Sequence, residues 1–192
     1  NSAEMVVDEL PPQADDIIEQ CGNLPLALSM IGAMVRGKPA SYWEDALEAL
    51  QEQDLEDIAA RFPDYPYPNL FNALDVSIAA LDDDLREQYY DFCIFPDDVA
   101  IPEAVPLTFW QPLKARKVRS ALNELVSRHL LERDQDGRLT IHDLQLAYLR
   151  REVDDQVARH RRLFAEQQRR RLHDPEALGV GRDRVLAAAA QL

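Results

Sequence analysis

Cysteine, glycine and long apolar runs are scarce in this chain, and each scarcity excludes a class of protein. Only two cysteines, Cys21 and Cys93, and six glycines occur among 192 residues. Two cysteines set in apolar helical patterns do not form a disulfide framework, and they suit a reducing compartment. The longest uncharged stretch, residues 20–35, is shorter than the roughly 20 apolar residues that a bilayer-spanning helix needs. We therefore expect a cytoplasmic protein without a membrane helix.

The opening of the chain also lacks the features of a targeting segment. No basic, apolar and cleavage-site pattern precedes the first predicted helix. The chain begins at Asn1 rather than at Met. We expect it to be a piece excised from a longer protein.

Basic residues are scarce in the first part of the chain and frequent in the rest. Residues 1–110 contain four Lys or Arg and 23 Asp or Glu, whereas residues 111–192 contain 17 and 12. The net charge of −14 repels nucleic acid at long range, although a local basic patch is possible in the second part. We therefore expect no nucleic-acid partner for the chain as a whole.

Helical periodicity dominates residues 1–62 and predicts a small helical bundle. The first helix ends at Gly22, which stands where a left-handed cap is needed. Pro25 opens a second helix that is apolar on nearly every face, and such a helix is buried. Ser41 and Glu44 have the spacing of a capping box that begins a third helix.

Three prolines between Phe62 and Asn69 cannot continue a helix, and we place a domain boundary between residues 62 and 63. Beyond it the pattern predicts helices that lead into a β-hairpin, whose turn takes its positive φ from Gly137. The predicted helices cover residues 70–81, 85–95, 103–110, 118–129 and 143–152, and the hairpin covers residues 130–141. Helices followed by such a hairpin are typical of a winged helix.

The predicted fold class is therefore mainly α, a small helical bundle followed by a winged-helix domain with a β-hairpin wing. The bundle covers residues 1–62 and the winged helix covers residues 63–152. Residues 153–192, which begin with an Arg-rich amphipathic segment, are predicted to start a further helical segment.

Residues of the kinds that catalysis or metal binding needs are present but not clustered. The four histidines are scattered, and neither cysteine stands at C-x-x-C spacing. Residues 32–39 match most of a phosphate-binding loop, but a predicted buried helix precedes them and Pro39 replaces the hydroxyl residue that holds magnesium. We expect no catalytic residue, no bound metal and no enzymatic activity in this chain by itself.

Two short stretches remain as candidate binding elements. In the first, Gly22 caps one helix and Pro25 opens the next, which is also ordinary helix chemistry. In the second, Asp143 is predicted to be the N-cap of a helix. His142 then lies beside free backbone amides and the positive end of the helix dipole, where an anion such as phosphate is stabilised.

The order and separation of these stretches resemble a known family. Gly22-Asn23-Leu24-Pro25-Leu26-Ala27-Leu28 resembles the G-L-P-L-A motif of the NB-ARC (STAND-class) signalling ATPases, and Ile141-His142-Asp143 resembles their M-H-D motif. Residues 74–81 and 92–98 resemble the first helices of the family's winged-helix domain. The resemblance covers roughly residues 8–152 and is greatest to the apoptosome-forming branch. It implies an ARC1-like domain over residues 1–62 and an ARC2-like domain over residues 63–152.

The resemblance also implies a nucleotide switch. In the family, ADP lies between a P-loop domain, the helical domain and the winged helix. The motif proline and its neighbour, here Pro25 and Leu26, lie against the adenine, and the motif histidine, here His142, contacts the β-phosphate. His129 stands where relatives place a small hydroxyl residue against the nucleotide. The implied cofactors are ADP and ATP, and the implied partners are the protein's own P-loop domain and further copies, which assemble after ATP exchange.

A DNA-binding winged helix is the alternative hypothesis. Lys114, Arg116, Lys117 and Arg119 crowd the beginning of the helix that would enter the major groove, with further arginines on the wing. The same residues would also complement an acidic neighbouring domain, which we favour because the chain is strongly acidic. A third hypothesis is an adaptor whose Arg-rich segment, residues 156–171, recruits a partner.

Overall fold

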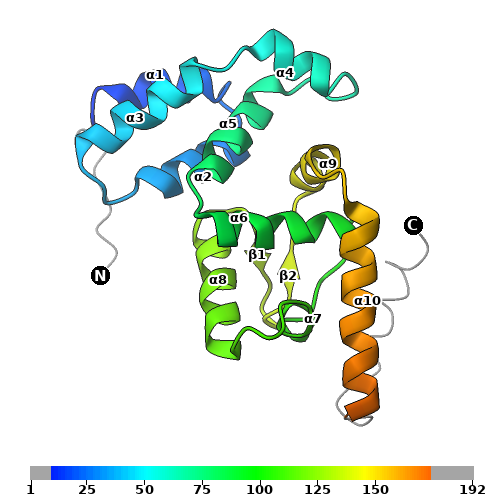
Figure 1. Cartoon of the computed structure of the whole chain (residues 1–192). Coiled ribbons are helices and arrows are strands. Elements are labelled where there is room, and N and C mark those ends of the chain that lie inside the picture. Colours follow the sequence, from blue (N-terminus) through cyan, green and yellow to red (C-terminus); the bar gives the residue numbers. More distant parts are fainter. Residues whose placement is uncertain (1–9, 174–192) are drawn as a thin grey trace. The chain divides into compact units, whose positions relative to one another are not determined.

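The computed structural model describes residues 10–173, with side chains through Glu166, and the chain divides into two compact units (Figure 1). The first unit ends at Leu81 and the second begins at Asp82. Both are built mainly of helices, and the second adds a small antiparallel sheet. The prediction of a mainly α fold with a β-hairpin wing is confirmed.

The first unit is a bundle of helices that share one buried core. Its elements are α1 (Gln13–Gln20), α2 (Pro25–Val35), α3 (Ala40–Gln51), α4 (Leu55–Arg61) and α5 (Pro68–Ala79). Helix α1 lies beside α3, and α2 packs mainly on α5 and also contacts α3 (Figure 1). Met30, Ile31 and Val35 of α2 are fully buried, as is Ala27, but Pro25 is exposed and the other residues of α2 are half-buried. The helix therefore buries one stripe, and the prediction that it is buried on nearly every face is wrong.

The division between the units falls later than the predicted boundary at residues 62 and 63. The proline-rich stretch does interrupt the helices, but α5 packs on α2, α3 and α4. Phe62 stacks on Phe71 with 4.0 Å between the ring centroids, and the Asn72 side chain donates a hydrogen bond to the carbonyl of Leu50 at 2.8 Å. The prolines therefore form a turn inside the first unit, and α5 belongs to that unit rather than to the winged helix.

The second unit has the order of elements expected of a winged helix. It contains α6 (Asp83–Tyr90), the short 3-10 helix η2 (Asp91–Ile94), α7 (Ala104–Phe109), α8 (Ala115–Ser127), β1 (Glu132–Arg133), β2 (Leu139–Thr140), α9 (Asp143–Glu152) and α10 (Gln156–His173). Strands β1 and β2 pair in antiparallel register, and Ile101 adds a bridge to Leu139 that the sequence pattern does not reveal.

The wing turn follows from its sequence. Gly137 takes φ +76°, as predicted for the turn. One carboxylate oxygen of Asp134 accepts hydrogen bonds from the backbone amides of Asp136 and Arg138, at 2.9 and 2.8 Å. The side chain of Asp134 therefore stabilises the turn to which it belongs.

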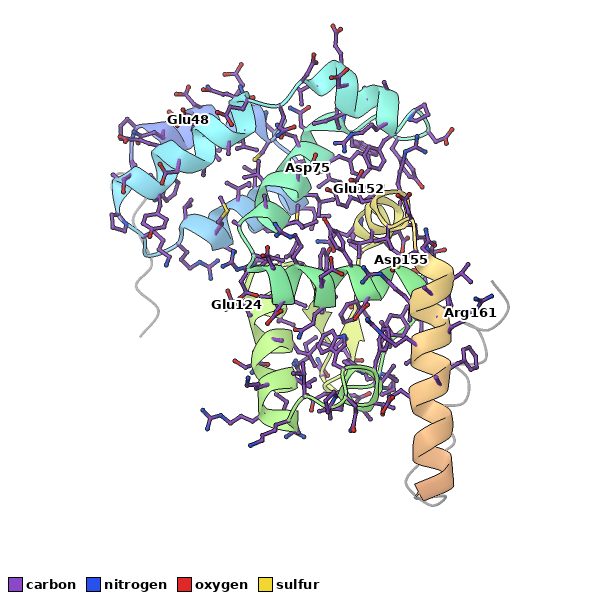
Figure 2. The ribbon with its side chains drawn as sticks, viewed as in Figure 1. Glu48, Asp75, Glu124, Glu152, Asp155 and Arg161 are labelled. Atoms are coloured by element: carbon purple, nitrogen blue, oxygen red, sulfur yellow. The ribbon has the colours of Figure 1, made fainter. Side chains whose placement is uncertain are left out.

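Helix α10 packs on α7 and η2 through a buried group of charges. Arg159, only 8% exposed, donates to the 3% exposed Asp91 at 2.8 Å, and the indole of Trp110 donates to the other oxygen of Asp91 at 2.9 Å. Arg159 also bonds Asp155, just before α10 (Figure 2), at 2.9 Å. The predicted helical segment after residue 153 thus packs on the second unit, while the part of that prediction beyond residue 173 lies outside the described residues.

Candidate functional site

The turn between α1 and α2 is built on two left-handed residues. Gly22 has φ +61° and Asn23 has φ +56°, and their amides bond the carbonyls of Glu19 and Ile18 at the end of α1. A Cβ atom on Gly22 would lie 3.2 Å from the Asn69 side chain. Gly22 is therefore required by both its backbone angle and its close neighbour.

Pro25 is the first residue of α2, where its missing N–H costs no helix hydrogen bond. Its ring is exposed, whereas the following Leu26 is half-buried and Ala27 is buried. The predicted helix start is confirmed. The first motif therefore presents a rigid apolar ring at the surface of the first unit.

His142 is the N-cap of α9 and is exposed. Its Nδ1 atom accepts the amide of Leu144 at 3.2 Å, and its own amide donates to Oε1 of Gln145 at 3.3 Å, which completes a capping box. The prediction that Asp143 is the N-cap is wrong. His142 has the extended backbone of a cap, with φ −69° and ψ 140°, and Asp143 is already the first residue of the helix.

The cap bond decides which nitrogen of the His142 ring carries the proton. Because Nδ1 accepts a hydrogen bond, the neutral imidazole holds its proton on Nε2. Nε2 is then a hydrogen-bond donor on an exposed side chain, at the positive end of the α9 dipole. This arrangement suits an anionic acceptor.

His129 follows the end of α8 in the left-handed conformation, with φ +55°, and is half-buried. Its carbonyl accepts a hydrogen bond from Nε2 of Gln145 at 2.9 Å. The structure therefore links His129 to His142 through one side chain, that of Gln145, which sequence reasoning missed. The capping-box spacing from residue 142 to residue 145 is the signal that would have found it.

The predicted site residues are divided between the two units. Gly22, Pro25 and Leu26 belong to the first unit, and His129, His142 and Asp143 belong to the second. The convergence of the two motifs on one nucleotide stays a prediction.

Two groups of basic residues bear on the DNA-binding hypothesis. Arg119 and Arg133 both bond Glu103, at 2.7 and 3.0 Å, and the hydrogen bond from Arg119 contributes most to lowering the pKa of that carboxyl. Another group, at the start of α8, is exposed and has no ion-pair partner among the described side chains: Lys114, Arg116 and Lys117. This second group is the basic surface of α8.

Two further observations concern the phosphate-loop pattern and the search for membrane helices and metal ligands. Residues 32–35 lie within α2, so the loop-like pattern there begins inside a helix. Among residues 10–173, no helix is both long and apolar enough for a membrane crossing, and no three potential metal ligands gather.

The sequence of the chain is similar to those of a known family. The model for the winged-helix domain of apoptotic protease-activating factor 1-like proteins matches residues 84–149. The chain is 33% identical over 174 residues to apoptotic protease-activating factor 1 of Homo sapiens, covering 88% of this chain and 14% of that protein. The protein of the same name in Danio rerio is 33% identical over 165 residues, covering 84% and 13%.

A more distant relative comes from plants. A probable disease resistance protein of Arabidopsis thaliana is 30% identical over 126 residues, covering 64% of this chain and 15% of that protein. The chain thus spans 15% or less of the length of each of these relatives. The chain therefore belongs with the NB-ARC proteins of the apoptotic protease-activating factor 1 type, and residues 84–149 are its winged-helix domain.

Proposed function

We propose that this chain is the nucleotide-sensing part of an apoptosome-like signalling ATPase, closing over ADP and opening when ATP replaces it. The ring of Pro25, with Leu26 beside it, contacts the adenine, and His142 donates a hydrogen bond to the β-phosphate of ADP. The P-loop domain of the same protein supplies the ATPase chemistry. ATP exchange releases the winged-helix domain and exposes the surfaces through which further copies assemble.

The observation that carries this proposal is the hydrogen bond at Nδ1 of the exposed His142 ring. Its Nδ1 atom is occupied by the amide of Leu144, so the neutral ring offers Nε2–H to an outside acceptor. A phosphate oxygen suits this donor because the start of α9 favours negative charge. The family match to residues 84–149 supports the assignment of the motif.

ADP release from a protein that carries this chain behind its P-loop domain tests the role of His142. His142→Asn keeps an oxygen that caps α9 but lacks the imidazole donor. We expect about 10- to 100-fold faster release, because a hydrogen bond to a charged acceptor contributes roughly 1.5–3 kcal/mol. Unchanged release would show that the imidazole does not hold the phosphate.

Pro25 is tested in the same assay. Pro25→Ala removes part of an apolar contact, and we expect roughly fivefold faster release, since about 1 kcal/mol of burial is lost. Pro12→Ala is the matched control, because Pro12 is another exposed proline at a helix start, on α1. If Pro25→Ala and His142→Asn both leave release unchanged, the site assignment is wrong.

A DNA-binding winged helix is the second candidate, favoured by the basic surface of α8. Fluorescence anisotropy with duplex DNA at low salt compares the two functions. Salt-sensitive submicromolar binding that is lost when Lys114, Arg116 and Lys117 are all replaced by Glu would establish the DNA function. We expect no such binding, because the net charge of −14 opposes it and Arg119 and Arg133 are held by Glu103.

A further inference from the structure

Gln145 is a buried amide whose two ends bond different parts of the second unit. The side chain is in the third position of α9, and the residue is only 2% exposed. Its Oε1 accepts the amide of His142 at 3.3 Å, and its Nε2 donates to the carbonyl of His129 at 2.9 Å. One side chain thus connects the end of α8 with the start of α9.

The two bonded residues flank the wing. His129 precedes β1 by a few residues, and His142 follows β2 after Ile141, so Gln145 joins the two ends of the hairpin at its base. A glutamine is suited to this position because its amide donates and accepts at the same time. An ionised glutamate lacks the donor, and a methionine of similar length has neither group.

The connection bears directly on the ring of His142. The backbone of His142 is held by Oε1 of Gln145, and the ring is held by the amide of Leu144 in the same turn. Loss of the first bond frees the backbone that aims the ring. The amide of His142 then needs another acceptor, which also favours movement of His142.

We propose that Gln145 is a positioning residue, which fixes the direction of the His142 imidazole and holds the His129 carbonyl at a set place beside it. This inference rests on the proposed function, because the direction of the ring matters for a nucleotide only if His142 contacts one. The position of the ring itself is measurable without any nucleotide.

The first measurement is the imidazole spectrum of His142 in the chain itself. Two-bond proton–nitrogen NMR distinguishes the tautomers, and we expect mainly the Nε2–H form in the wild type. In Gln145→Met we expect a mixture of tautomers and averaged shifts, because the cap loses one of its two bonds. Thr108→Val is the control, since Thr108 is also buried and its hydroxyl donates to the local carbonyl of Ala104. An unchanged spectrum in Gln145→Met would overturn the inference.

The second measurement is ADP release from the protein with its P-loop domain. We expect Gln145→Met to accelerate release about three- to tenfold, and to add nothing once His142 is already Asn, because coupled residues are not additive. Equal acceleration in both backgrounds would mean that Gln145 acts through general stability and would overturn the inference. Unchanged release in the single variant His142→Asn would instead refute the proposed function. The NMR measurement would then still test whether Gln145 positions the ring.

Discussion

Gly22 has a backbone angle that other residues rarely adopt, and its missing side chain leaves room for Asn69. We expect Gly22→Ala to lower the free energy of unfolding of the first unit by about 1–2 kcal/mol, the usual cost of a left-handed conformation. Gly32→Ala is the matched control. It lies inside α2 with no atom within 4 Å of its added Cβ, so a gain of about 0.5–1 kcal/mol is expected. Hydrogen exchange of the α1 and α2 amides measures both, and a neutral Gly22→Ala would contradict the prediction.

Glu103 links stability to pH. Arg119 and Arg133 lower its pKa from the ordinary value of 4.5, so the folded protein binds this proton less readily than the unfolded chain. Its contribution is present above pH 4.5 and is lost as the pH falls through the lowered pKa. We expect Glu103→Gln to cost about 1 kcal/mol at neutral pH and to flatten the loss of stability below pH 4.5, measured by urea unfolding. Asp136→Asn, at a more exposed ion pair, is the control, and equal flattening in both variants would contradict the role of Glu103.

Residue-level prediction succeeded where local chemistry decides. Gly22 and Pro25 have the backbone roles expected of them, because a left-handed cap and a helix start depend on the residue itself. The predicted caps at Asp143 and Ser41 are wrong. Helix α3 begins at Ala40 after Pro39, and the Glu44 carboxylate accepts from Gln13 at 3.1 Å instead. Cap propensities rank residues, but the position of the first helical turn depends on the packing around it.

At the scale of helices, the apolar pattern of the sequence did not predict what α5 and α10 pack against. The spacing of apolar residues predicts α5, but not that its buried face meets α2, α3 and α4. Likewise, the Arg-rich composition predicts α10, whereas the contact between Arg159 and Asp91 joins residues 68 positions apart. Long-range pairing of this kind leaves no local signal.

Substitution of Arg159 tests whether its buried ion pair with Asp91 holds α10 on the second unit. Arg159→Met leaves the buried carboxylate of Asp91 short of a partner, and we expect the second unit to lose about 3–5 kcal/mol. The double variant with Asp91→Asn should recover part of that loss, because the unpaired charge is gone. Arg161→Met is the control, since Arg161 is exposed on the same helix (Figure 2). Chemical unfolding measures the three variants, and equal effects of Arg159→Met and Arg161→Met would refute the role of the buried pair.

The whole molecule divides its charge unevenly between the two units. The chain through Leu81 has three basic and 15 acidic residues, whereas the chain from Asp82 has 18 and 20. Composition reveals this asymmetry, and helical spacing followed by a hairpin signal predicts the winged helix. The position of the division between the units was not predicted, because it depends on which unit α5 packs in.

This asymmetry predicts opposite responses to salt. Raising the ionic strength screens repulsion among the acidic residues of the first unit, and it weakens the ion pairs of the second. At about 0.3 M salt the Debye length is about 6 Å. We expect this salt to slow hydrogen exchange of the amides of α1–α4 and not of those of α6–α10. Hydrogen exchange resolved by residue measures this, and uniform protection of both units would contradict it.

The buried carboxylate of Asp91 also sets the smallest length at which the winged helix is self-sufficient. The family match ends at residue 149, but the guanidinium groups that neutralise Asp91 belong to Arg159 and Arg162. A polypeptide trimmed at the family limit would retain the wing and His142 but would leave the buried carboxyl of Asp91 without both arginines, and burial would then favour its protonated form. We therefore expect an autonomous module to include the first two turns of α10, which contain both of these arginines.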